Sequence, residues 1–264
     1  IIRPGNKTEA QYFFESRFVA YRVSHDQGNT GLITGYYEPD LHGSWTADAR
    51  YRFPLYALPK DLISSDLGSF DDKWKGERIA GRMDDSRYIP YYSRAEIEQG
   101  ALRGRQLEIV WVDNAIDSFF LHIQGSGRVT LPDGTHVRIG YAGRNGRRYT
   151  AVGRELVAAG VMPLADVTMP SIRAWMEENP VAAQALMRKN KSFVFFRVIK
   201  GEGPIGAQGV VLTPRRSIAV DRKYWPLGVP VWMDTTDPGA RPAVPLRRLG
   251  VAQDTGSAIK GAVR

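Results

Sequence analysis

Glycine and proline are spread along this whole chain of 264 residues, which contains 27 glycines and 16 prolines. Both residues are unfavourable inside helices and favourable in turns, so they limit the chain to short elements. Only a few stretches show the apolar spacing of a helix. The pattern therefore predicts a mainly β protein with many turns and a few helices. A hydrophobic content of 43% is enough for one large core or two modest ones, so we expect one or two domains.

Local patterns predict individual elements. A helix over residues 9–23 is expected to pack on the body, and Ser93 with Glu96 fits a capping box. Asp133-Gly134 between alternating residues predicts a hairpin. The polar residues 60–87 predict a long excursion outside the core. Further helices are predicted at 149–159, 171–178 and 181–189, and strands at 31–37, 51–58, 107–112, 118–123, 128–131, 136–141, 193–198, 210–212, 218–220, 229–233 and 249–252.

The chain has no cysteine, which excludes disulfides and thiolate metal sites. His25, His42, His122 and His136 are scattered without the spacing of metal ligands. We therefore predict neither a metal site nor another cofactor. No apolar run approaches the ~18 residues of a membrane span, and no signal-peptide core is visible. Any targeting signal is expected to have been removed.

A net charge of +8 and a pI near 9.7 indicate a surface that attracts polyanions. Nucleic acid is the first candidate, but no nucleic-acid module appears. Lysine and arginine are dispersed and form only short clusters, such as Arg147-Arg148, Arg215-Arg216 and Arg247-Arg248. A generally basic surface is the simpler interpretation, and an acidic carbohydrate polymer would be attracted by the same charge. We predict no nucleic-acid partner.

Two aspartates each end a short apolar run, Asp221 after residues 218–220 and Asp254 after 251–253. Carboxylates at strand ends can be catalytic, but from this feature alone the role of turn former is favoured. Asp254-Thr255-Gly256 also matches the aspartic-protease triplet, yet one copy would need a homodimer to complete a dyad.

Two glycine-rich turns are further candidates. The turn 124–127 could present amide and hydroxyl groups to a ligand, but it lacks the spacing of a nucleophile elbow. The turn 143–146 resembles an ordinary hairpin turn. The residues alone thus indicate a basic, mostly β protein with polar and aromatic groups suited to sugars.

Six sequence motifs and their order along the chain give a more specific indication than any single feature. The chain closely resembles the membrane-bound lytic transglycosylase A (MltA) family in successive blocks: GYYEP at 35–39, LHIQGSG at 121–127, IGYAGRNG at 139–146, SFVFF at 192–196, AVDRKYWPLG at 219–228 and AQDTGSAIKG at 252–261. This resemblance implies a double-psi β-barrel formed by residues 1–38 and 193–264, with its C-terminal end missing. It also implies an inserted, second β-rich domain over 39–192, and a deep groove between the two domains for a glycan strand.

The resemblance further implies an activity. The family cleaves the β-1,4 bond between N-acetylmuramic acid (MurNAc) and N-acetylglucosamine (GlcNAc) in peptidoglycan without water, and leaves a 1,6-anhydromuramic product. Ordinary glycosidases need two carboxyl groups. Here the C6 hydroxyl of the sugar attacks C1, so one carboxyl group can serve first as acid and then as base. Burial or neighbouring carboxylates would have to raise its pKa so that it starts protonated.

The matching motifs indicate which positions of this sequence correspond to the functional residues of the family. Asp221 and Asp254 match the first two aspartates of the three-aspartate (3D) segment and are predicted to support catalysis. The third, the catalytic acid, is expected one or two positions beyond Arg264. A chain without it should be inactive and lack a closing strand. The predicted substrate-binding residues are Thr34, Gly35, Tyr36, Tyr37, Gln124, Gly125, Ser126, Tyr141, Arg144, Asn145 and Lys260.

The resemblance also implies a lipoprotein on the periplasmic face of a Gram-negative outer membrane, with membrane contact only through an N-terminal lipid anchor that this chain lacks. Its predicted partner is the peptidoglycan glycan strand. Two other classes stay open. One is a glycan-binding module without chemistry, because double-psi barrels also serve binding. The other is a basic scaffold that binds other cell-wall enzymes.

Overall fold

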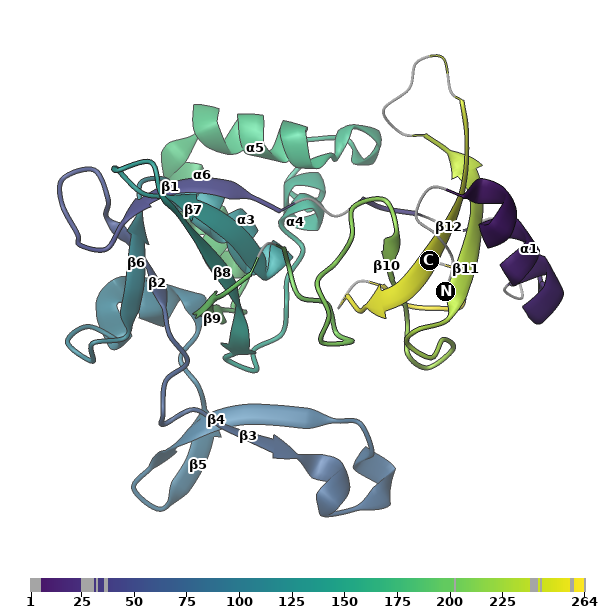
Figure 1. The fold of residues 1–264 in the computed structure, drawn as a ribbon. Coiled ribbons are helices and arrows are strands. Elements are labelled where there is room, and N and C mark those ends of the chain that lie inside the picture. Colours follow the sequence, from purple (N-terminus) through teal and green to yellow (C-terminus); the bar gives the residue numbers. More distant parts are fainter. Residues whose placement is uncertain are drawn as a thin grey trace. The chain divides into compact units, whose positions relative to one another are not determined.

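The computed structural model describes residues 6–24, 31, 33–35, 38–201, 203–237, 242, 244–256 and 259–263. The chain forms two compact units (Figure 1). We call Ile1–Gly35 with Ile205–Arg264 the discontinuous unit, and Tyr36–Pro204 the inserted unit. The fold is mixed, with several sheets, 27% helix and 30% strand. The prediction of a mainly β chain therefore underestimated the helices. In the described part of the chain, no helix has the length and apolar character to cross a bilayer.

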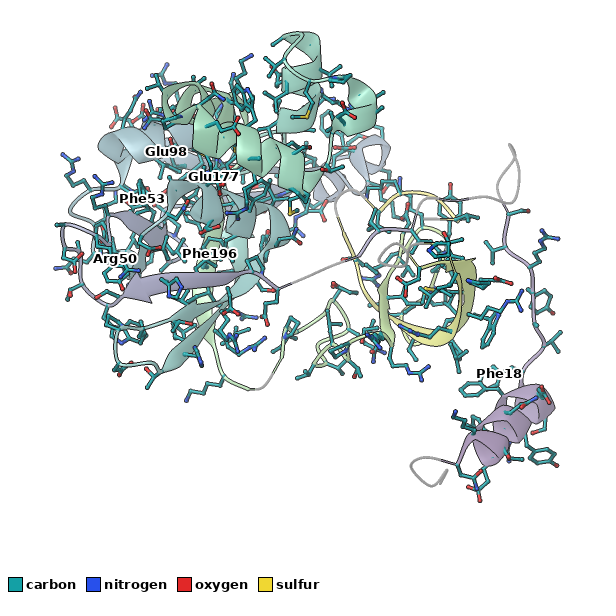
Figure 2. All side chains as sticks on the ribbon, turned by 90° about the horizontal axis from the view of Figure 1, so that it is seen from above. Phe18, Arg50, Phe53, Glu98, Glu177 and Phe196 are labelled. Atoms are coloured by element: carbon teal, nitrogen blue, oxygen red, sulfur yellow. The ribbon has the colours of Figure 1, made fainter. Side chains whose placement is uncertain are left out.

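A six-stranded sheet forms the centre of the inserted unit, in the order β2-β6-β1-β7-β8-β9. Only β1 and β7 are parallel; the other neighbours are antiparallel. Buried aliphatic side chains line one core of this sheet, and Phe53 and Phe196 belong to it (Figure 2). The strands are β1 (Asp40–Ser44), β2 (Phe53–Tyr56), β6 (Glu108–Val112), β7 (Ser126–Thr130), β8 (His136–Arg144) and β9 (Val194–Ile199).

Two features of this sheet bear on the predictions. The hairpin over β7 and β8 is confirmed, with Gly134 at a φ of +81° in its turn. Strand β9 pairs with β8, so it belongs to the inserted unit. The boundary between the units thus lies after Pro204 and not at residue 192 as predicted. The reason is that β9 is hydrogen-bonded to β8 and therefore belongs to the same unit as β8.

Helices gather on the same unit and share a second core with Phe119 and Phe120. Residues 118–123, predicted as a strand, are instead part of helix α3. The Asn114 side chain starts α3 by accepting hydrogen bonds from the N–H groups of Ile116 (2.8 Å) and Asp117 (3.1 Å). The later helices agree with prediction. The helices are α3 (Ala115–Gln124), α4 (Val152–Ala158), η4 (Leu164–Asp166), α5 (Met169–Glu178) and α6 (Pro180–Lys189).

The predicted polar excursion is a small sheet of its own, in the order β3-β4-β5 (Figure 1). We call residues 60–90 the arm. The capping box predicted at Ser93 is confirmed, because Ser93 and Glu96 satisfy each other's backbone N–H groups. The elements here are β3 (Ile63–Asp66), η1 (Leu67–Ser69), η2 (Asp72–Trp74), β4 (Arg78–Asp84), β5 (Arg87–Pro90), α2 (Arg94–Glu96) and η3 (Ile97–Ala101).

Two basic side chains lie inside the inserted unit. Arg94 is 2% exposed and donates hydrogen bonds to the carbonyls of Asn190 (3.2 Å) and Ser192 (2.9 Å). Burial lowers its pKa to about 10. His122 is 7% exposed, and its Nδ1 accepts the N–H of Val194 at 3.0 Å. Burial, and then the charge of Arg94, hold the pKa of His122 well below its usual value.

Acidification is therefore expected to destabilise the protein through His122. The unfolded chain binds a proton below about pH 6.5 while native His122 stays neutral, so the free energy of unfolding falls by about 1.4 kcal/mol per pH unit. Between pH 7 and pH 5 the expected loss is about 2 kcal/mol, measured by urea unfolding. His122→Gln should flatten this slope, whereas the exposed His136→Gln should not. A slope that His122→Gln leaves unchanged would contradict this assignment.

The discontinuous unit contains a three-stranded sheet in the order β10-β12-β11. Strands β10 and β12 are parallel, and β11 and β12 are antiparallel. Asn6 is the N-cap of helix α1, and its side chain accepts the N–H of Glu9 at 3.0 Å; Phe18 follows the end of the helix (Figure 2). The elements are α1 (Lys7–Arg17), β10 (Ser217–Ala219), β11 (Pro230–Thr236) and β12 (Pro245–Asp254).

Two expectations for this unit differ from the structure. None of the residues of α1 is buried, so its predicted packing on the body was wrong. Gly31 and residues 33–35 are not in a strand, and Leu32, Tyr36 and Tyr37 lie outside the described residues. The double-psi barrel stays a prediction, since the described part of this unit shows one sheet of three strands.

Candidate functional site

The two predicted aspartates lie at the same end of the parallel pair β10 and β12. Ala219 stands opposite Asp254 in the ladder, and the Val220 N–H donates to the Asp254 carbonyl at 2.9 Å. Asp221 follows directly. Parallel pairing thus brings together two residues that are 33 positions apart in the sequence.

The Asp221 carboxylate is a buried hydrogen-bond acceptor. Its Oδ1 accepts the N–H of Lys223 at 3.0 Å, and its Oδ2 accepts the N–H of Gly261 at 2.9 Å. The amide of Gly261, then that of Lys223, and the charges of Lys260 and Lys223 lower the pKa of Asp221. Asp221 therefore stays ionised and holds backbone in place; it is no proton donor.

Asp221, Trp225 and Gly31 together hold the segment 259–263 in place, and we call this set of contacts the latch. Besides the bond to Gly261, the Trp225 Nε1 donates to the carbonyl of Ala262 at 2.8 Å. Gly31 closes the other side: a Cβ there would lie 2.2 Å from the Val263 carbonyl oxygen, so only glycine fits. The chain leading to position 264 is thus fixed at three consecutive residues.

Asp254 is held differently. Its Oδ1 accepts the Ala207 N–H at 3.0 Å, while its Oδ2 accepts no hydrogen bond from a described residue. The turn that carries Ala207 lies against β12, because the Gln208 N–H donates to the Gln253 carbonyl at 3.0 Å. Asp254 is only half-buried, so one carboxylate oxygen is available to a ligand or to a neighbouring acid.

A second group of predicted residues meets within the inserted unit. Gly125 ends α3 in the left-handed region at φ +83°, and a Cβ there would lie 4.0 Å from the Cβ of Tyr141. Ser126 pairs with Gly140. The structure therefore brings the turn 124–126 next to Tyr141, which is 49% exposed. Burial raises the pKa of Tyr141.

Arg144 and one unpredicted residue lie near Tyr141. The charges of Arg144 and Arg78 both oppose the rise in the pKa of Tyr141. Arg78 starts β4, and β4 reaches this place because Ala80 contacts Gly146 closely. No sequence signal links residues 78 and 141, since the influence of Arg78 depends on the contact between Ala80 and Gly146.

Asn145 requires a correction. Its side chain is 0% exposed and donates to the carbonyls of Tyr92 (2.8 Å) and Lys191 (2.9 Å). Its Oδ1 accepts the N–H groups of Phe193 (2.9 Å) and Arg147 (3.3 Å). A side chain used in this way holds three chain segments together, so we assign it a structural role and not the predicted substrate contact.

For the remaining predicted site residues, the structure gives little more than their exposure. Lys260 is exposed, and its charge acts on Asp221. Thr34 and Gly35 are exposed, whereas Tyr36 and Tyr37 lie outside the described residues. The described part of the chain contains no group of three or more histidines, aspartates or glutamates placed to hold a metal ion. That the residues of the two units line one groove stays a prediction.

Comparison with known proteins gives two family matches. The MltA specific insert domain matches residues 32–197, and the 3D domain matches residues 216–264. A curated relative, the membrane-bound lytic murein transglycosylase A of Vibrio cholerae serotype O1, is 31% identical over 239 residues. That alignment covers 89% of this chain and 58% of the relative. The chain thus spans less than two thirds of the length of that relative.

Solved structures agree. The lytic transglycosylase LtgG of Burkholderia pseudomallei is 41% identical, with a TM-score of 0.63, over 100% of this chain and 72% of its own. Escherichia coli MltA with bound chitohexaose is 30% identical, with a TM-score of 0.71, over 87% of this chain and 62% of its own. Because the insert-domain match alone spans residues 32–197, well over half of the sequence, this chain belongs to the MltA family, with an MltA-specific insert domain and a C-terminal 3D domain.

Proposed function

We propose that the protein is a lytic transglycosylase that cleaves the MurNAc–GlcNAc β-1,4 bond of peptidoglycan and releases 1,6-anhydromuramic products. The observation that carries the proposal is the arrangement of Asp221, Asp254 and the latched segment 259–263 in a chain of the MltA family. A relative of 30% identity was solved with bound chitohexaose, which supports a glycan strand as the ligand.

Each residue has a role in this proposal. One carboxyl group, expected one or two positions beyond Arg264, protonates the glycosidic oxygen and then accepts the proton of the C6 hydroxyl. Asp221 fixes the backbone that leads to it, through the bond to Gly261. Asp254 lies at the same end of the parallel pair as Asp221 and keeps one carboxylate oxygen unbonded among described residues. A neighbouring carboxylate raises the pKa of an acid, so Asp254 would help the catalytic group to start protonated.

The proposed architecture keeps the double-psi barrel for the discontinuous unit, with the boundary at Ile205. In this proposal the turn 124–126 and Tyr141 of the inserted unit, and Lys260 of the discontinuous unit, each contact the glycan strand. Tyr36 and Tyr37 would supply faces for stacking on sugar rings. A periplasmic lipoprotein on the outer membrane remains the proposed location, supported by the relative's description as membrane-bound.

Digestion of purified peptidoglycan by the full-length protein tests the proposal. Mass spectrometry of the released muropeptides should show 1,6-anhydro ends, about 18 Da lighter than reducing ends because no water is added. Heat-inactivated protein is the control. Reducing ends would instead indicate hydrolysis and a second carboxylate in the chemistry, with Asp254 the first candidate.

A glycan-binding module without chemistry is the second candidate. The observation that favours it is that both aspartates accept hydrogen bonds from backbone amides, as purely structural carboxylates do. Retained binding of peptidoglycan with no released product would support this function and contradict the first.

A further inference from the structure

Arg78 and Arg144 are two exposed cations without an ionic partner. Among the described residues, neither guanidinium has a carboxylate within 4.0 Å, whereas arginines nearby do, such as Arg82 with Asp84 at 3.3 Å. Asp66 stands opposite Arg78 in the β3·β4 ladder, but its Oδ1 accepts the Gly68 N–H at 3.0 Å. Exposed arginines without a carboxylate partner are available for an anionic ligand.

The chain segments that carry the two arginines meet, although the arginines are 66 positions apart in the sequence. A Cβ on Gly146 would lie 2.6 Å from the Cβ of Ala80, so β4 touches the chain just after β8. Arg78 and Arg144 are each two residues before this contact. Both also act electrostatically on Tyr141, whose ring is half-exposed and adjoins the turn at Gly125.

We propose that Tyr141, Arg144 and Arg78 form a subsite for a carboxylate carried by the MurNAc residues of the substrate. This rests on the proposed function and adds to it the group that is recognised. A guanidinium binds a carboxylate through two parallel hydrogen bonds. The phenol hydroxyl of Tyr141 is a neutral donor that can add a third. The carboxylate belongs either to a free lactyl group or to the peptide stem, which share this chemistry.

Four hexasaccharides test the proposal by calorimetric titration of the full-length protein. Chitohexaose is neutral. A GlcNAc–MurNAc hexasaccharide has free lactyl carboxylates, its methylamide has none, and a fourth form carries L-alanyl-D-glutamate on each lactyl group. At low ionic strength the carboxylate forms should bind about tenfold more tightly than the neutral forms. A preference for the free lactyl form assigns that group, and a preference for the peptide form alone assigns the stem. Mass spectrometry confirms that each ligand stays intact.

Substitutions test which residues cause the tighter binding of the carboxylate forms. Arg78→Gln and Arg144→Gln should each weaken the preference, and the double variant should abolish it, so that the carboxylate and neutral forms bind alike. Arg87→Gln, which removes the same charge from an exposed strand of the arm, should keep it. Equal binding of carboxylate and methylamide forms, or a preference that survives the double variant, would overturn the subsite. Binding of none of the four ligands would overturn the proposed function as well.

Discussion

Replacing Asn145 by alanine is expected to lower the free energy of unfolding by about 3–4 kcal/mol, among the largest effects of any single substitution in this chain. The side chain is fully buried. Its amide donates to the carbonyls of Tyr92 and Lys191, and its oxygen accepts the Phe193 N–H. Alanine would leave the Tyr92 carbonyl and the Phe193 N–H without these partners, and the Lys191 carbonyl would keep only the Arg94 N–H at 3.2 Å. Each such group costs about 1–3 kcal/mol, and some relaxation of the loop reduces the sum.

The expected loss is measured by urea unfolding with Asn179→Ala as the matched control. Asn179 is a half-buried asparagine whose amide makes one hydrogen bond, to the Trp175 carbonyl at 2.9 Å. Its replacement should cost about 1 kcal/mol. If Asn145→Ala costs no more than Asn179→Ala, the three contacts of Asn145 are not what holds its turn.

Local patterns predicted those parts of the fold that depend on neighbours in the sequence. The hairpin at Asp133-Gly134 and the capping box at Ser93 were both confirmed, because each depends on residues a few positions apart. The helices α4, α5 and α6 also agree with their apolar spacing. For the site, parallel pairing of β10 and β12 brought Asp221 and Asp254 together, which is consistent with the family resemblance that singled them out.

Features that depend on distant contacts were missed. The segment 118–123 has an apolar run that suits a strand or a buried helix, and the cap at Asn114 decided for the helix. Pairing of β9 with β8 moved the unit boundary. The segment with Asn145 resembled an ordinary hairpin turn, and its predicted substrate contact came from the family resemblance; the hydrogen bonds to Tyr92 and Lys191 show that its side chain is used inside the protein. Partners such as these cannot be read from a single turn.

Asp221→Ala is expected to reduce the rate of anhydromuropeptide release about a hundredfold, while the Kd for chitohexaose changes little. The Asp221 carboxylate joins the turn at Lys223 to the segment at Gly261 through two hydrogen bonds. Without them, the contacts that the described residues leave to the segment 259–263 are the indole bond to Ala262, the bond of the Ile259 N–H to the Gly256 carbonyl, and the packing of Gly31. A displacement of about 1 Å at the acid is enough for a loss of this size. The effect should therefore appear in kcat and not in binding.

Three further measurements separate this positioning role from general destabilisation. Hydrogen exchange of the Gly261 amide should quicken in Asp221→Ala. In Asp221→Asn the exchange rate should lie between those of the unsubstituted protein and Asp221→Ala, because the side-chain oxygen of asparagine can still accept one N–H. Asp234→Ala, which removes an exposed carboxylate paired with Arg247 at 3.3 Å, should leave both rate and exchange unchanged. Trp225→Phe should cause a smaller loss of kcat, since the ring stays and only its donor is removed. Faster exchange at Gly261 with an unaltered kcat would show that the latch fixes the backbone without serving the reaction.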